Sequence, residues 1–254
     1  MQIEPPDEHP IKLLTLSDSH PCSYLPNKKA NSIFLDSNTP PSWQQYCNLS
    51  KMGFRRSGNH YYRPHCSGCH ACMSCRIQND NFVANKKRFK RIINKAALFS
   101  FKLARPVFSD EHYHLYERYI NTRHKDGDMF PASPEQYSNF LLSDLPFCHF
   151  FEVRAQDGTL ISCTVIDFLD DGISAIYTYF DPDVSNFSLG VLAVLKLHRL
   201  AIKYELPYIY LGYWVKDSAK MNYKKQFAPL DLFNGESWQG LDLVQLDSLH
   251  TGPA

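Results

Sequence analysis

Apolar residues recur at two different periods along this chain, and the two periods predict a mixture of helices and strands. In the first part of the chain the apolar runs are short and are interrupted by Pro, Asn and Gly. Ser42 can cap a helix, and Gly53 can end it. The elements expected here are a strand at 32–35, a helix at 43–52, a hairpin over 54–63, a strand at 74–78 and a basic helix at 85–94.

The second part of the chain has longer and more regular patterns. Ser109 and Ser133 stand where helix caps are expected, and Pro134 suits a first helical position. Alternating apolar residues and two Asp-Gly-type turns then predict three antiparallel strands. The expected elements are helices at 109–123 and 133–142, strands at 148–155, 160–168 and 173–180, a helix at 189–204 and a buried strand at 208–211. Helices followed by a strand meander indicate the α+β class.

The length of 254 residues allows two modest domains. We expect a disordered segment at 1–10, a basic Cys-containing domain at 11–105, a second domain at 106–240 and a tail at 241–254. The first ten residues lack the basic and apolar regions of an export signal, and no apolar stretch is long enough to span a membrane. A cytoplasmic location without membrane partners is therefore expected.

Charge is distributed unevenly, although the net charge is only +1. Residues 51–105 contain thirteen Lys or Arg and one Asp, whereas residues 106–181 contain thirteen Asp or Glu and four Lys or Arg. The basic block suggests a polyanionic partner such as nucleic acid. Two solvated faces that attract each other would explain the pattern equally well.

The basic block includes a cluster that fits nucleic-acid phosphates. Its cations are Lys86, Lys87, Arg88, Lys90 and Arg91. Lys and Arg contacts to phosphates give affinity that falls with salt. Phe89, which lies among them, could stack on an unpaired base. A solvated helix face is the alternative for each of these residues.

Four cysteines follow one another at every third position: Cys66, Cys69, Cys72 and Cys75. A regular helix would place the first and last on opposite faces, so one metal ion could bind all four only from a loop. Zinc or an iron–sulfur cluster is one interpretation, with Cys22 as a distant additional ligand. Reduced cysteines that serve as small buried residues are the alternative.

The strand at 173–180, the helix at 189–204 and the next strand follow the order found in GCN5-related N-acyltransferases. That architecture holds an acyl donor where two strands separate near a helix N-terminus. Enzymes of that type that use coenzyme A have a glycine-rich loop for the pyrophosphate. The loop before residue 189 contains a single glycine, Gly190, so coenzyme A is not the expected donor.

Several phrases of the sequence resemble the bacterial aspartate/glutamate leucyltransferases, small relatives of the arginyl-tRNA–protein transferases. The phrases are GFRRSG at 53–58, HYYRPHC at 60–66, YTYFDP at 177–182 and LGYW at 211–214, followed by Ser218, Lys220, Met221, Tyr223, Lys224 and Phe227. The similarity extends from about Cys22 to Pro229. Cys75 departs from the bacterial pattern, and the paired cysteines of the eukaryotic relatives are only partly matched.

This resemblance implies transfer of leucine from leucyl-tRNA to proteins that begin with Asp or Glu, which marks them for the N-degron pathway. The partners are leucyl-tRNA and such proteins, with no DNA. The aminoacyl ester is already activated, so no cofactor is required. An arginyl-tRNA donor, a coenzyme A-dependent acetyltransferase and a nucleic-acid-binding module without catalysis remain alternatives.

The resemblance places the reacting groups between the strand end at 177–181 and the block at 210–224. Asp181 would orient or deprotonate the acceptor amine, although an Asp-Pro turn explains this residue as well. Four tyrosines can donate hydrogen bonds to the ester or the terminal adenosine: Tyr177, Tyr179, Tyr213 and Tyr223. Trp214 could stack on the adenine and Lys220 could contact the tRNA. Each aromatic residue could instead belong to the core.

Recognition of an acidic acceptor residue requires a fixed cation, and a guanidinium is best suited. Arg76, directly after the cysteines, is the first candidate, followed by Arg63 and Lys224. The cysteine loop would hold Arg76 in place with or without a metal.

Overall fold

The structure is a computed structural model that describes residues 10–15, 19–125 and 127–248. The segment at 1–10 that was expected to be disordered lies outside these residues, except for its last residue. The described chain forms two compact units. The first combines residues up to Cys75 with those from Tyr213 onward, and the second comprises Arg76–Gly212. Both units contain helices and strands, which confirms a mixed α/β fold.

The first unit is built from short strands and one well-capped helix. Its sheet has the order β1-β4-β6-β5, and β13 pairs with β14 as an antiparallel hairpin. The bounds are β1 Leu13–Thr15, β2 His20–Pro21, β3 Lys29–Ala30, β4 Ser32–Leu35, α1 Trp43–Lys51, β5 Arg55–Ser57, β6 His60–Pro64, β13 Leu230–Phe233, β14 Trp238–Leu241 and α6 Leu243–Ser248, with a 3-10 helix at Asn222–Phe227.

Local sequence explains the beginning and end of α1. Ser42 accepts a hydrogen bond from the backbone of Gln45, whose side chain accepts one from the backbone of Ser42, so the two residues form a capping box. Gly53 ends the helix with a φ of +83°, a conformation that favours glycine. Both residues have the roles expected from the sequence.

The second unit contains a run of strands in the order β12-β11-β10-β9-β8. Neighbours are antiparallel except β11 and β12, which are parallel. The bounds are α2 Lys87–Lys95, β8 Ser100–Ala104, α3 Asp110–Arg123, α4 Pro134–Leu141, β9 Cys148–Arg154, β10 Leu160–Phe168, β11 Gly172–Phe180 and α5 Leu189–Lys203, with a 3-10 turn at Ser185–Phe187. Strands β7 (Met73–Gln78) and β12 (Tyr208–Trp214) run across the boundary between the units.

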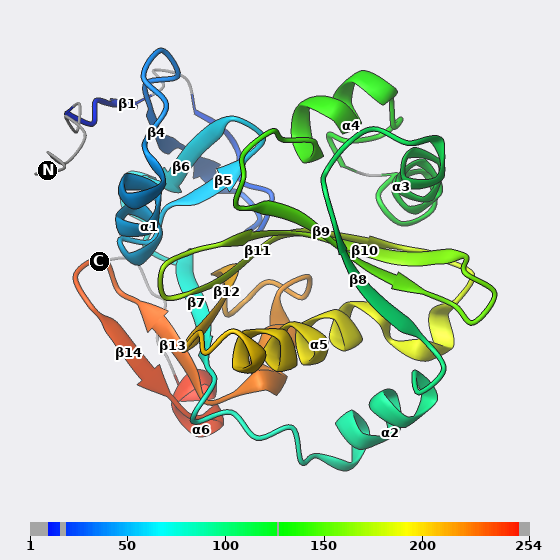
Figure 1. Ribbon diagram of the computed structural model, residues 1–254. Coiled ribbons are helices and arrows are strands. Elements are labelled where there is room, and N and C mark those ends of the chain that lie inside the picture. Colours follow the sequence, from blue (N-terminus) through cyan, green and yellow to red (C-terminus); the bar gives the residue numbers. More distant parts are fainter. Residues whose placement is uncertain (1–9, 16–18, 126, 249–254) are drawn as a thin grey trace, which may run out of the picture. The chain divides into compact units, whose positions relative to one another are not determined.

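Helices cover both faces of these strands in the second unit. In Figure 1, α3 and α4 lie on one face and α5 on the other. The core beneath α3 and α4 is aromatic and includes Tyr116, Tyr137 and Tyr179, each with no exposed surface. Nine residues of α5 are buried, in agreement with its apolar sequence. None of the described helices is long and apolar enough to cross a membrane.

The boundary between the units differs from the one expected at residues 105 and 106. The C-terminal segment packs with the N-terminal one: the Trp238 indole donates to the Lys51 carbonyl at 2.7 Å, and the Tyr213 hydroxyl lies 3.1 Å from the Gly53 carbonyl. The tail expected from residue 241 includes α6, whose Leu246 is fully buried. Pairs of residues that are 160 and 187 positions apart leave no periodic signal in the sequence.

Candidate active site

Strand β11 is irregular just beyond the three residues that pair with β12. On the side of β10, Val165 lies opposite Tyr177, but the next residue, Ile166, lies opposite Ala175. Ile176 is therefore the extra residue of a β-bulge, which interrupts the regular hydrogen-bond ladder. On the side of β12, only the first three residues of β11 are paired. The ladder thus omits Ile176 on one side and does not reach it on the other.

Tyr177 follows the bulge and has an unsatisfied hydroxyl. Its ring packs edge-on against Phe140, with ring centroids 5.0 Å apart, and lies 6.4 Å from the ring of Tyr119. Within the described part of the chain, its buried hydroxyl oxygen has no hydrogen-bond partner. Burial raises the pKa of Tyr177, and neighbouring tyrosines add to the effect. The hydroxyl therefore keeps its proton and can act as a donor.

Tyr179, which was also expected at the site, is hydrogen-bonded within a buried network. Its hydroxyl lies 2.9 Å from Nδ1 of His112, and Nε2 of His112 lies 3.2 Å from Oε1 of Glu152. Burial lowers the pKa of His112 and outweighs the opposing effect of Glu152. A carboxylate can only accept, so the neutral imidazole carries its proton on Nε2 and accepts the Tyr179 proton at Nδ1.

The same network continues to the surface through Arg154. Its Nε lies 2.6 Å from Oε2 of Glu152, and its two terminal nitrogens lie 2.9 Å from the two oxygens of Glu111. This bidentate pair raises the pKa of Arg154 and lowers that of Glu111. Glu152 is 3% exposed, so its partners on both sides compensate for the removal of its charge from water.

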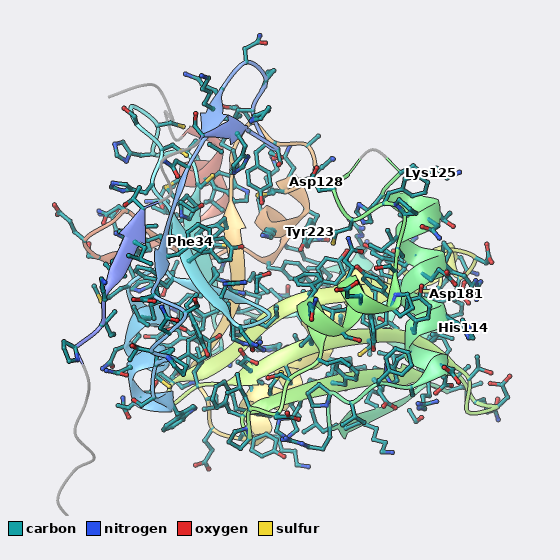
Figure 2. The ribbon with its side chains drawn as sticks, turned by 90° about the horizontal axis from the view of Figure 1, so that it is seen from above. Phe34, His114, Lys125, Asp128, Asp181 and Tyr223 are labelled. Atoms are coloured by element: carbon teal, nitrogen blue, oxygen red, sulfur yellow. The ribbon has the colours of Figure 1, made fainter. Side chains whose placement is uncertain are left out.

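Asp181 directly follows β11 and is held by an arginine of α3. Its Oδ1 accepts from Nη2 of Arg118 at 2.9 Å, and the same nitrogen lies 2.7 Å from Asp183. Oδ1 also accepts from the backbone N–H of Asp183, the arrangement of an Asx turn. Figure 2 shows Asp181 beside α3, which carries His114. The structure thus gives Asp181 the turn role that the sequence left open.

Arg76 does not have the open guanidinium expected of an acceptor-binding residue. It is 7% exposed, and its guanidinium carbon lies 3.5 Å from the centroid of the Tyr208 ring. Nη1 donates to the Tyr210 hydroxyl at 3.2 Å, and that hydroxyl donates to Asp171 at 2.9 Å. This network lies inside the second unit, where a cation–π contact and hydrogen bonds stabilise the buried charge.

Helix α2 presents the basic face expected from the sequence. The side chains of Lys86, Lys87, Arg88, Lys90 and Arg91 are all exposed. Phe89 lies in the same helix but has no exposed surface, and its ring centroid is 6.0 Å from that of Phe82. The prediction that Phe89 stacks on a base is therefore wrong, because an apolar ring on the inner face of an amphipathic helix belongs to the core.

Further cations lie on α5, which packs against α2. Arg199 and Lys203 are exposed, and Lys196 is half-buried with its ammonium 4.0 Å from the centroid of the Phe101 ring. Sequence reasoning did not assign these residues to the basic surface because they stand alone in an apolar helix. Only the packing of the two helices places α5 beside α2.

The cysteines of the first unit line one cavity. Cys22, Cys66, Cys69 and Cys72 all contribute to its wall, whereas Cys75 is fully buried in β7. All eight cysteines of the chain are reduced. Across residues 10–15, 19–125 and 127–248, no group of three or more His, Cys, Asp or Glu side chains is arranged to hold a metal ion. Metal binding at these cysteines remains a prediction.

Two aromatic residues of the first unit that were expected at the site are structural. Trp214 is 1% exposed and therefore cannot stack on an adenine in this structure. The Tyr213 hydroxyl lies between the carbonyls of Gly53 and Tyr62, at 3.1 and 3.2 Å. Both residues end β12, in which five of the seven residues are buried.

The C-terminal cations differ in exposure. Lys224 is 6% exposed, burial lowers its pKa, and its ammonium donates to the Tyr213 carbonyl. It is therefore not available to an acceptor. Lys220 and Tyr223 are exposed, which agrees with a surface role, and Figure 2 labels Tyr223.

Comparison with known proteins gives the family. The model of the arginine-tRNA-protein transferase N terminus matches residues 20–91, and that of the C terminus matches residues 111–234. The aspartate/glutamate leucyltransferase of Pseudomonas putida strain GB-1 is 46% identical over 88% of this chain and 94% of its own length. The chain belongs to the arginine-tRNA-protein transferase family.

A second leucyltransferase of this family, from Pseudomonas savastanoi pv. phaseolicola, is 48% identical over 86% of this chain and 92% of its own length. Among solved structures, that of L-PGS from Bacillus licheniformis has a TM-score of 0.45 and 13% identity, and the match covers 57% of this chain and 46% of that one. A similarity of this extent carries no argument about function.

In this member of the transferase family, the buried polar network beside Tyr179 was not predicted from the sequence. Glu152 stands alone in the apolar strand sequence CHFFEVR, and His112 follows the cap of α3. A single carboxylate in a buried strand indicates a partner, but the sequence does not show which residue that partner is. His112 and Glu152 are 40 positions apart and meet only through packing.

The network predicts how stability depends on pH. Because the pKa of His112 lies below its usual value of 6.5 in the folded state, the unfolded state binds the proton more readily. The contribution of His112 to the free energy of unfolding is therefore present above pH 6.5 and is lost as the pH falls below it. Urea denaturation at pH 7.5 and 5.5 should show a smaller loss for His112→Gln than for the wild type. An equal loss in both proteins would contradict this assignment.

Proposed function

We propose that this protein transfers leucine from leucyl-tRNA to the N-terminal Asp or Glu of acceptor proteins. The observation that carries the proposal is the 46–48% identity to aspartate/glutamate leucyltransferases along nearly their whole length. The family is named for an arginine donor, but these relatives are named for leucine. The transferred residue would mark the acceptor for the N-degron pathway.

The reaction requires positioning more than activation. The neutral α-amine of the acceptor attacks the carbonyl carbon of the leucyl ester, so that a C–N bond forms and the C–O bond to the terminal ribose breaks. One amine proton passes to the ribose oxygen that leaves. An α-amine has a usual pKa of about 7.7–8.0, so a useful fraction is neutral near pH 7. No cofactor is needed for this exchange.

The shape of β11 supports an acyltransferase arrangement of the GCN5-related type. The strand pairs with β12 over three residues and then continues alone on that side, as expected for two strands that separate around an acyl donor. Helix α5 begins directly after this region, with Ser188 in a left-handed conformation before it. The loop contains only Gly190, which favours an aminoacyl ester over coenzyme A.

Two groups at the bulge suit the negative charge that develops on the ester oxygen. Ile176 has no paired residue on β10, so its backbone N–H would be one donor, and the unpartnered hydroxyl of Tyr177 would be the other. Preorganised donors of this kind stabilise a tetrahedral oxyanion. Asp181, held by Arg118, would orient the amine from the end of the same strand.

The exposed cations of α2 and α5 support a surface for the tRNA acceptor arm. Five basic residues of α2 and its cap lie in solvent, and Arg199 and Lys203 of α5 are also exposed. Such contacts to phosphates supply affinity but little sequence information. The surface is therefore suited to holding the tRNA while β11 receives its aminoacyl end.

The proposed activity has a direct assay. Radiolabelled leucyl-tRNA and arginyl-tRNA are offered separately with peptides that begin with Asp, Glu, Asn or Lys. We expect leucine to be transferred to the Asp and Glu peptides only. Transfer of arginine instead would change the donor, and transfer from neither donor would refute the proposal.

The variant Tyr177→Phe tests whether the Tyr177 hydroxyl has a catalytic or a structural role. Because the hydroxyl has no partner within the described chain, its removal should leave the free energy of unfolding unchanged or raise it by about 1 kcal/mol. We expect kcat to fall about 10²-fold, as when an oxyanion donor is removed. Single-turnover kinetics with saturating leucyl-tRNA measures this. Tyr137→Phe, in the same aromatic cluster but on α4, is the matched control and should keep kcat within about twofold. A normal kcat for Tyr177→Phe would exclude the role.

Charge reversal on α2 tests the tRNA surface. Lys87→Glu with Lys90→Glu should weaken leucyl-tRNA binding at low salt and reduce the slope of log affinity against log salt by about 0.7–0.9 for each phosphate that is no longer neutralised. Filter binding from 50 to 200 mM salt measures the slope. Lys12→Glu, at an exposed lysine that pairs with the partly buried Asp36 in the first unit, is the control. An unchanged slope in the α2 variant would place the tRNA elsewhere.

A further inference from the structure

The first unit contains a cavity to which the reaction described above assigns no role. Its volume is about 1090 Å³, large enough for several residues of a peptide. Residues of β4 and β6, the cysteine turn and the turn between β13 and β14 form its wall. All of these residues belong to the first unit.

The charges that line this cavity are mostly positive. Lys28, Lys29 and Arg63 lie in the wall. Glu236 is the one acidic residue among those that line the cavity. A cavity with this balance favours a negatively charged ligand.

Arg63 is held in a position to receive a carboxylate. Its Nη1 donates to the Met52 carbonyl at 3.0 Å, and its guanidinium carbon lies 5.1 Å from the centroid of the Phe54 ring. Among the described residues, Nε and Nη2 have no hydrogen-bond acceptor. A guanidinium fixed at one nitrogen, with the other two open, can bind a carboxylate through two parallel hydrogen bonds.

A second group in the wall also lacks a partner. Ser74 lines the cavity and is 3% exposed, yet its hydroxyl makes no hydrogen bond to any described residue. Buried hydroxyls are normally satisfied, and an orphan one is destabilising. A ligand with acceptor oxygens would satisfy it. This observation is independent of the charge of the wall.

We propose that this cavity binds the acidic N-terminal residue of the acceptor protein, with Arg63 as the carboxylate-binding residue and Lys28 and Lys29 in support. The proposal rests on the proposed leucyl transfer and locates its acceptor specificity. It replaces Arg76 and Lys224, whose charges are buried in other contacts.

The test substitutes Arg63→Gln, which keeps part of the side chain over Phe54 but removes the charge. Peptides that differ only in an N-terminal Asp or Asn are compared as acceptors at saturating leucyl-tRNA. We expect the KM for the Asp peptide to rise at least tenfold, while the KM for leucyl-tRNA changes less than twofold. Lys12→Gln, an exposed lysine outside the cavity, should match the wild type. Unchanged acid preference, or equal loss for every peptide, would overturn the proposal.

Two further measurements keep the test decisive. Lys28 and Lys29 are exposed, so the double variant Lys28→Gln with Lys29→Gln should still fold. Its KM for the Asp peptide should rise. The proposal can therefore be tested even if the Arg63 variant misfolds. Calorimetric titration of the Asp peptide into tRNA-free protein measures binding at the cavity without catalysis. Tighter binding of Asp than Asn peptides in the wild type, abolished in the variants, supports the cavity even if no leucine is transferred. Equal binding of both peptides refutes it.

Discussion

The pairing of β11 is the constraint on which the second unit depends. The strand forms a long antiparallel ladder with β10, which fixes its position, yet it pairs with β12 over only three residues. The bulge at Ile176 then changes which side chains face each side of the sheet beyond that point. As a result, the positions of Tyr177, Tyr179 and Asp181 beyond the bulge are fixed by this one strand. A regular strand would instead have a continuous ladder with β10 at this position.

The polar groups around β11 fall into two classes that differ in what their surroundings supply. From Tyr179 through His112, Glu152 and Arg154 every group has a partner, so this chain of contacts stabilises the packing of α3 on the sheet. Tyr177, two residues earlier, has none among the described residues. A buried hydroxyl without a partner costs stability, and such cost is commonly retained where a substrate supplies the missing partner.

Charge is divided between the two units in a way that suits two different anions. The second unit exposes cations on α2 and α5, where solvated lysines and arginines can follow a phosphate backbone. The first unit places cations in the wall of a cavity, where the partial burial of Arg63 strengthens its interaction with a carboxylate. Cys66, Cys69 and Cys72, which belong to the most regular cysteine pattern of the sequence, line that same wall, and Cys75 lies in the core.

The sequence by itself determined the elements that depend on neighbouring residues. The capping box of α1, the caps of α3 and α4, the three-strand meander and the basic face of α2 all follow from residues a few positions apart, and all are present. Local phrases also identified the family. Tertiary structure alone decided which polar residues are accessible: Arg76, Trp214, Lys224 and Phe89 look like exposed candidates in the sequence but are buried. Burial and long-range pairs such as His112 with Glu152 depend on segments far apart in the chain, and local patterns carry no information about those pairs.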